Sequence, residues 1–140
     1  MITKTKRIVQ ATFICLVVLG FLTFKTPIQC LGEEISATID VAPATLNLQS
    51  NGSVVTVHTD IPYNDVNFST VYLNGVAIKS SKIDNCGFFV AKFLMDEIKA
   101  LDGLIIGDYN TLTLVGVTTS GDTFIGTQDI IVINVIPSGK

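Results

Sequence analysis

Polar and apolar residues alternate along most of the chain beyond residue 34, and this period of two is typical of half-buried β-strands. The expected strands cover residues 35–41, 45–49, 55–61, 68–73, 76–78, 88–93, 109–118 and 123–136. Turn residues separate these segments, and short strands spaced in this way predict a sandwich or a barrel. The pattern therefore predicts an all-β domain.

Three turn signals indicate how the strands connect. Asn51-Gly52 and Asn74-Gly75 are each predicted to form a hairpin turn, because both residue types tolerate a positive φ. Residues 120–122, Ser-Gly-Asp, predict a third turn between the last two strands. Pro62 is expected to end the strand before it, since it has no N–H to donate to a neighbouring strand.

The last expected strand and the only expected helix need separate comment. Gly126 inside the last strand predicts a bulge or a kink. Residues 130–135 are apolar on both parities, except for one asparagine, and are therefore predicted to be buried on both faces or to run through the middle of a sheet. The helix is expected at residues 94–101, where three apolar residues recur at helical spacing. Residues 79–87 are expected to be polar and rich in turns.

The first 32 residues have the layout of a secretory leader. Three basic residues among the first seven precede an apolar run of 17 residues, 8–24, and Glu33 begins the acidic part of the chain. Cleavage is expected after Gly32, which leaves residues 33–140 as the β-sandwich domain. The apolar run is also at the short end of the roughly 17–25 residues that span a bilayer, so an uncleaved signal anchor is the alternative.

Charge separates the leader from the rest of the chain. All 12 acidic residues lie beyond residue 32, together with 5 of the 9 basic ones, so residues 33–140 carry a net charge of −7. A surface of this sign repels phosphate backbones, and nucleic-acid binding is therefore not expected.

The cysteines and the single histidine do not predict a reactive site. Cys15 and Cys30 lie in the leader, and acylation of Cys30 is disfavoured because no small residue precedes it. Cys86 alone cannot form an internal disulfide and is expected to be a buried or loop thiol. His58 lies on the polar parity of its strand and is expected to be exposed, because a metal site needs three or four ligands. No catalytic, cofactor or metal site is predicted.

The stretches TLNLQSNG (45–52), STVYLNG (69–75) and FIGTQDIIV (124–132) resemble a domain that is common in secreted archaeal and bacterial proteins. The resemblance covers nearly all of residues 36–136. It implies an immunoglobulin-like antiparallel β-sandwich of the kind often appended to larger extracellular proteins. It also implies a location outside the cell or in the cell envelope.

One loop departs from the pattern of this family. Its members often carry an acidic loop suited to Ca²⁺ before the strand that here reads FFVAKF. The equivalent residues 83–87 keep one carboxylate, Asp84, and have a thiol at Cys86. Asp84 and Asn85 would supply two oxygen ligands, whereas Ca²⁺ takes six to eight. A turn at Asp84 is therefore preferred over a calcium site.

Asn51 and Asn67 each begin an N-glycosylation sequon, Asn51-Gly52-Ser53 and Asn67-Phe68-Ser69. Both are expected in loops or at the start of a strand, where a glycosylating enzyme has access. For Asn51 a structural role in a turn is the preferred interpretation.

The functional hypothesis is a non-catalytic secreted or cell-surface module with a structural, adhesive or protein-interaction role. Its partner would be an extracellular protein or a glycan surface, and the chain would contact a membrane only if its leader is retained. One alternative is a carbohydrate-binding module that uses Tyr63, Tyr72 and Tyr109. The other is a polymer in which residues 33–41 of one subunit pair with the open edge of another.

Overall fold

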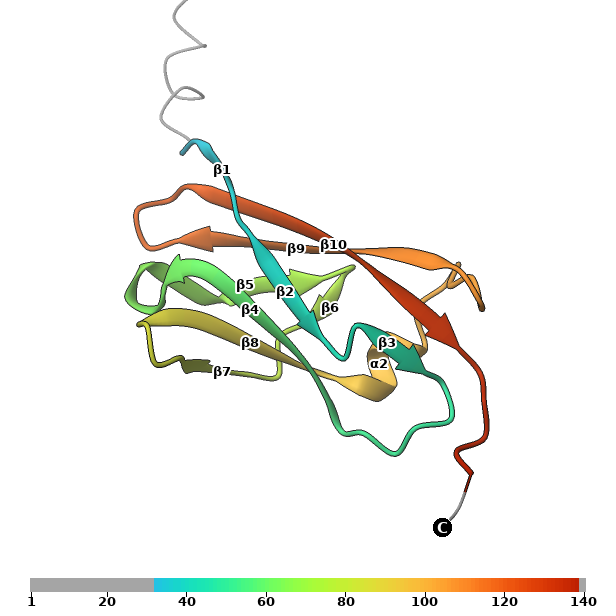
Figure 1. Cartoon of the computed structure of the whole chain (residues 1–140). Helices are drawn as coiled ribbons and strands as arrows, with labels where there is room; N and C mark the ends of the chain where they lie inside the picture. Colours follow the sequence, from blue (N-terminus) through green and yellow to red (C-terminus); the bar gives the residue numbers. More distant parts are fainter. Residues whose placement is uncertain (1–31, 139–140) are drawn as a thin grey trace, which may run out of the picture. The chain divides into compact units, whose positions relative to one another are not determined.

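The computed structural model describes residues 32–138, which fold into strands with one short α-helix and one 3-10 turn (Figure 1). The elements are β1 (Glu34–Ser36), β2 (Ile39–Ala42), β3 (Thr45–Asn47), β4 (Val54–Pro62), η1 (Tyr63–Asp65), β5 (Val66–Leu73), β6 (Val76–Ala77), β7 (Ser80–Ile83), β8 (Phe88–Leu94), α2 (Met95–Lys99), β9 (Tyr109–Thr118) and β10 (Thr123–Ile133). Nearly all of the predicted leader lies outside the described residues, so its cleavage and its alternative as an anchor stay predictions.

The strands form two sheets around one core (Figure 1). Sheet A has the order β1-β10-β9-β5-β6, with β3 also pairing with β10, and sheet B has the order β2-β4-β8-β7. Neighbouring strands are antiparallel, except that β1 and β3 run parallel to β10. The predicted all-β sandwich with one short helix is confirmed.

The alternating pattern determines which side chains enter the core. In β4, Val55, Val57, Thr59 and Ile61 are all buried, as their parity predicts. The largest buried side chains come from both sheets and from α2, and they include Phe89, Phe93, Phe124, Leu46, Leu73, Ile98, Leu112 and Leu114. Each fully buried side chain of this size contributes about 1.5–3 kcal/mol, so the core is the main source of stability.

The first expected strand is divided between the two sheets, so the prediction of one strand over residues 35–41 is wrong. β1 pairs with β10 in sheet A, whereas β2 pairs with β4 in sheet B. The crossing between them is held by the Ala37 N–H, which donates to Ile125 O at 2.8 Å, and by the Thr38 N–H, which donates to Asp60 Oδ1 at 2.9 Å. The chain then returns to sheet A as β3.

Gly126 allows this crossing to lie close to sheet A. The predicted bulge is absent, because β9 and β10 pair in unbroken register from Thr123 to Ile131. A Cβ on Gly126 would lie 2.7 Å from Ala37 O and 2.7 Å from Ile39 Cγ2. The glycine is therefore required by a tertiary contact and not by the shape of its own strand.

Two of the three predicted turns are confirmed. Asn74 and Gly75 have φ values of 47° and 83° and join β5 to β6, and Gly121 has a φ of 95° in the turn between β9 and β10. The prediction for Asn51-Gly52 is wrong, because this pair connects β3 of sheet A to β4 of sheet B and closes no hairpin.

The two segments that flank β8 differ from the prediction, the first in its type of structure and the second in its length. Residues 79–87 contain the strand β7, which pairs with β8 and forms an edge of sheet B. The helix is shorter than predicted, and its buried residues are Met95 and Ile98.

The end of the last strand is buried on one face only. Ile130 and Val132 are buried, Ile131 and Ile133 are half-buried, and Val135 lies beyond the strand with 57% exposure. The predicted burial on both faces is therefore wrong. The alternative, a strand in the middle of a sheet, is confirmed for residues 130–133, because β10 lies between β9 on one side and β1 and β3 on the other.

Candidate interaction surface

The two residues with candidate reactive side chains lie at the surface of sheet B. His58 of β4 lies between Asp40 of β2 and Val90 of β8, and it is half-buried, whereas it was expected to be exposed. Cys86 is exposed in the loop between β7 and β8, in agreement with the expectation of a loop thiol. Within residues 32–138, no three or more His, Cys, Asp and Glu side chains are grouped as a metal site would require.

Asp84 organises the loop that the family resemblance associates with calcium. Its Oδ1 accepts hydrogen bonds from the Cys86 N–H at 2.8 Å and from the Phe88 N–H at 2.9 Å, and its backbone O accepts one from the Gly87 N–H at 3.2 Å. Gly87 has a φ of 90°, which closes the turn. The preferred interpretation of Asp84 as a turn residue is thus confirmed.

These hydrogen bonds predict how stability depends on pH. The backbone N–H of Phe88, and to a smaller extent those of Cys86 and Gly87 and the charge of His58, lower the pKa of Asp84 below its ordinary value of 3.8. A carboxylate with a lowered pKa stabilises the folded state above the unfolded pKa, and this contribution is lost as the pH falls through the folded pKa. In thermal unfolding, wild type should therefore exceed Asp84→Asn in stability at neutral pH, and the difference should shrink below pH 3.8. Parallel curves over this range would contradict the assignment.

The three tyrosines do not form one stacking surface. Tyr63 packs against Phe68 and Phe89, with ring centroids 5.1 and 6.3 Å away, and so supports the core. Tyr72 and Tyr109 are exposed on strands of sheet A, at 41% and 63%. Tyr72 of β5 lies beside Val115 of β9, and Val115 is six residues away from Tyr109 along the same strand. The two tyrosines are therefore separated by roughly 20 Å along the strand direction.

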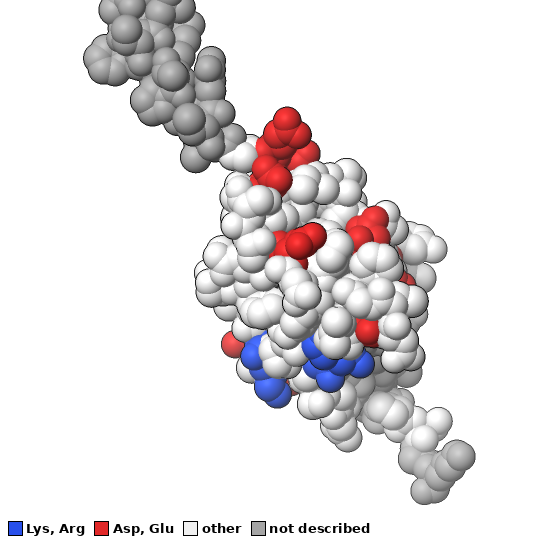
Figure 2. Space-filling view, turned by 90° about the vertical axis from the view of Figure 1, so that its left-hand side faces the viewer, with Lys and Arg blue, Asp and Glu red and all other residues white. Residues whose placement is uncertain are grey.

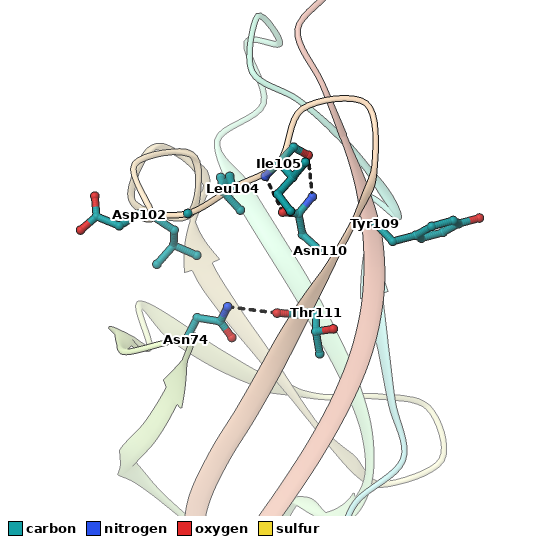
Figure 3. A pocket seen from close by; sticks show the side chains of 9 residues that line it. Asn74, Asp102, Leu104, Ile105, Tyr109, Asn110 and Thr111 are labelled. Atoms are coloured by element: carbon teal, nitrogen blue, oxygen red, sulfur yellow. Dashed lines mark hydrogen bonds between the residues drawn. The ribbon is translucent and has the colours of Figure 1, made fainter.

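A cavity of about 490 Å³ lies where the loop before β9 meets the turn between β5 and β6 (Figure 3). Its amide side chains already hold the scaffold together. Asn74 Nδ2 donates to Thr111 O at 3.2 Å, while Asn110 Nδ2 donates to Ile105 O at 2.9 Å and its Oδ1 accepts from the Ile105 N–H at 2.7 Å. The Tyr109 ring points away from these two amides (Figure 3). The polar lining therefore organises the loop and leaves few side-chain groups for a ligand.

Acidic side chains gather at one end of the domain, where the β9–β10 turn and the loop after β4 lie. Asp60, Asp65 and Asp122 line a cavity of about 400 Å³ there, and Asp122 Oδ1 accepts a hydrogen bond from the Glu33 N–H at 2.9 Å. Figure 2 shows acidic residues over the upper and middle parts of this side of the domain, with basic residues near its lower edge.

The outward-facing residues of β9 and β10, together with Tyr72 of β5, form a surface that we call the β9/β10 face. Its members are Tyr72, Tyr109, Thr111, Thr113, Val115, Val117, Thr123, Ile125, Thr127, Asp129 and Ile131. Tyr72, Val115 and Ile125 lie side by side in one apolar row across three strands. Asp129 is the only charged member, and its Oδ1 accepts a hydrogen bond from Thr111 Oγ1 at 2.6 Å.

The outward face of sheet B differs in charge. One row across its four strands places Asp40, His58, Val90 and Lys82 side by side, and Lys92 lies in the next row. The sequence contained a signal for this difference, since the solvent-facing parity of residues 109–117 has no charged residue. Alternation alone does not distinguish a surface that stays in contact with water from one that a partner covers, so this surface was not predicted.

Both sequon asparagines are exposed. Asn51 lies in the connection between the sheets, and Asn67 is the second residue of β5, where Ser69 Oγ donates a hydrogen bond to Asn67 Oδ1 at 2.9 Å. Access to both sites therefore agrees with the expectation, and their glycosylation stays a prediction.

In the part of the chain from residue 32 to residue 138, no helix has the length and apolar character needed to cross a bilayer. Comparisons of the chain with models of protein families, with curated proteins and with solved structures found no match.

Proposed function

We propose that this protein is a secreted or cell-surface, non-catalytic module that binds an extracellular protein through the β9/β10 face. The observation that carries the proposal is the apolar row of Tyr72, Val115 and Ile125 on a face with one carboxylate, in a domain whose net charge is −7. The role would be structural, adhesive or one of protein recognition.

The physical reason is the cost of removing charges from water. Charged groups lose hydration when an interface forms, so the centres of interfaces are depleted in charge and enriched in aromatic residues. The β9/β10 face can be covered at low desolvation cost, because its central side chains are those of valine, isoleucine, threonine and tyrosine. The outward face of sheet B, with Asp40, His58, Lys82 and Lys92, would lose more hydration.

We also propose that the sandwich is of the immunoglobulin-like type. In such domains four strands, A, B, E and D, form one sheet, and the other contains G, F and C, with C′ added in some forms. The orders β2-β4-β8-β7 and β10-β9-β5-β6 correspond to these if β2 is strand A and β10 is strand G. This agreement supports the assignment.

The two alternatives have less support. A glycan-binding surface would need neighbouring aromatic rings. Tyr63 instead packs against Phe68 and Phe89, and Tyr72 lies beside a position of β9 that is six residues away from Tyr109. A polymer made by strand donation would need a free N-terminal strand, whereas β1 and β2 are both paired within their own chain. These contacts favour the interaction module.

The proposal predicts that one charge on the β9/β10 face abolishes binding. Purified protein would be immobilised and exposed to cell-envelope and culture fractions of the producing cells, and the recovered proteins identified by mass spectrometry. Val115→Glu should reduce recovery of the partner at least tenfold, because the new charge would be buried without a counter-ion. The intact mass of the exported form would test cleavage after Gly32 in the same preparation.

Thr56→Glu is the matched control, since Thr56 is also half-buried and outward-facing on a central strand, but in sheet B beside Lys92. It should bind as wild type does. Equal recovery with wild type and Val115→Glu would refute the β9/β10 face as the binding surface. Binding to a glycan array that is lost on Tyr72→Ala would instead support the carbohydrate alternative.

A further inference from the structure

We infer that Asn51 is a site of spontaneous chemical modification, at which the side-chain amide is lost and the backbone forms a succinimide. The Gly52 backbone nitrogen attacks Cγ of Asn51, the bond from Cγ to the side-chain nitrogen breaks, and ammonia leaves. Water then opens the five-membered ring at either carbonyl, which yields aspartate or isoaspartate. A following glycine favours this reaction, since it has no Cβ to crowd the attacking nitrogen.

The chain contains two Asn-Gly pairs, and the structure separates their reactivity. The second pair, Asn74-Gly75, is locked in the turn between β5 and β6. Asn74 Nδ2 donates to Thr111 O at 3.2 Å, and its Oδ1 accepts from the Thr113 N–H at 2.6 Å. Both hydrogen bonds have to break before Cγ can turn towards the Gly75 nitrogen, so the folded protein protects this pair.

Asn51 has no such restraint. It is exposed in the connection between β3 and β4, and within residues 32–138 no hydrogen bond holds its side chain. The flanking residues are anchored, because Lys99 Nζ donates to Ser50 O at 2.6 Å and the Met95 N–H donates to Ser53 O at 3.0 Å. Between these anchors, the side chain of Asn51 is free to approach the next nitrogen.

Packing of this loop against α2 is consistent with a glycine after Asn51, because a larger residue would require the end of the Met95 side chain to move. A Cβ on Gly52 would lie 2.8 Å from both Sδ and Cε of Met95, a buried residue of α2. Packing against the helix therefore favours glycine at position 52, and this keeps a reactive pair in an exposed loop.

The modification has two consequences. It adds a negative charge to a loop of an already acidic domain. It also destroys the acceptor of the Asn51-Gly52-Ser53 sequon, so glycosylation and succinimide formation at Asn51 exclude each other. The inference does not depend on the proposed interaction at the β9/β10 face, because Asn51 is not part of that face.

The experiment compares the two pairs within one molecule. The full chain, made in a host that does not glycosylate, would be incubated for days in mildly alkaline buffer at physiological temperature. Peptide mapping would then measure aspartate and isoaspartate at both positions. In the folded protein Asn51 should be converted roughly tenfold or more faster than Asn74, since only Asn74 has to break two hydrogen bonds. In denaturant the two rates should converge, because both Asn-Gly pairs then lie in an unfolded chain and neither asparagine is held by hydrogen bonds.

Asn51→Gln is the control, and it should remove the fast release of ammonia while Asn74 still reacts slowly. Equal rates at Asn51 and Asn74 in the folded protein would overturn the inference. So would an Asn51 that reacts in denaturant but not in the folded chain, since this would show that the loop protects it.

Discussion

Gly116→Ala is expected to lower the free energy of unfolding by about 2–3 kcal/mol, because a methyl group at this position has no space in the core. Gly116 of β9 lies directly opposite Phe124 of β10, and a Cβ at residue 116 would overlap with Phe124 Cζ. The phenylalanine ring is fully buried, so it cannot move aside without displacing other core side chains.

Urea denaturation of wild type and Gly116→Ala measures this effect, and a double-mutant cycle with Phe124→Leu identifies its cause. Leucine does not reach as far as the ring, so the alanine should cost about 1–2 kcal/mol less when Phe124 has been shortened. Val117→Thr, an outward-facing change on the same strand, should alter stability by only about 0.5 kcal/mol. If the losses in the free energy of unfolding were additive for Gly116→Ala and Phe124→Leu, this would argue against a contact between residues 116 and 124.

Thr59→Val is expected to cost about 2–4 kcal/mol, although valine has nearly the same shape as threonine. Thr59 is buried in β4, where the regular pairing of β4 with β8 shifts between His58 and Pro62. Its Oγ1 donates to Phe89 O at 2.7 Å and accepts from the Ile61 N–H at 3.2 Å. Valine would leave both backbone groups without this hydrogen-bond partner, and a buried polar group without a partner lowers the stability of the folded state.

Thr59→Ser separates the hydroxyl from the methyl group. Serine keeps the oxygen and loses one methyl, so its expected cost is about 1 kcal/mol. Unfolding by urea or heat should therefore rank wild type first, Thr59→Ser second and Thr59→Val third. A valine variant as stable as the serine variant would show that the hydroxyl does not hold this irregular part of the ladder.

Substitutions on the two outward faces should behave differently from these core changes. Val115→Glu and Thr56→Glu both replace half-buried, solvent-facing residues, and neither removes a buried contact of the kind made by Gly116 or Thr59. A loss of binding by Val115→Glu at nearly unchanged stability would therefore be an effect on the surface. This contrast separates the proposed function from a general loss of folding.

Much of the fold was predictable from local patterns. The strand at residues 109–118 was predicted with its observed bounds, and the end of β4 at Pro62 was also expected. The turns at Asn74-Gly75 and at Gly121 were predictable because the positive φ values they need are a property of those residues themselves. Which side chains of β4 are buried was also predictable, because successive side chains of a strand point to opposite faces and only one of the two sets is apolar.

The candidate site was predictable only in part. The exposure of Asn51 and Asn67 and the turn at Asp84 followed from the types of residue present. The apolar row of Tyr72, Val115 and Ile125 did not, because its members come from three strands whose register no local pattern determines.

Local patterns in the sequence establish that this chain forms strands, which residues of each strand share a face, and where the turns at Asn74-Gly75 and Gly121 lie. Tertiary structure alone decided that residues 35–41 divide between two sheets and that Asn51-Gly52 joins the sheets. It also decided that Gly116, Gly126 and Gly52 face Phe124, Ala37 and Met95. The alternation of polar and apolar residues indicates which side chains of a strand are buried. It does not indicate the sheet, because a strand has the same alternation in either sheet. The partner of a strand or of a glycine depends on contacts between residues far apart in the chain.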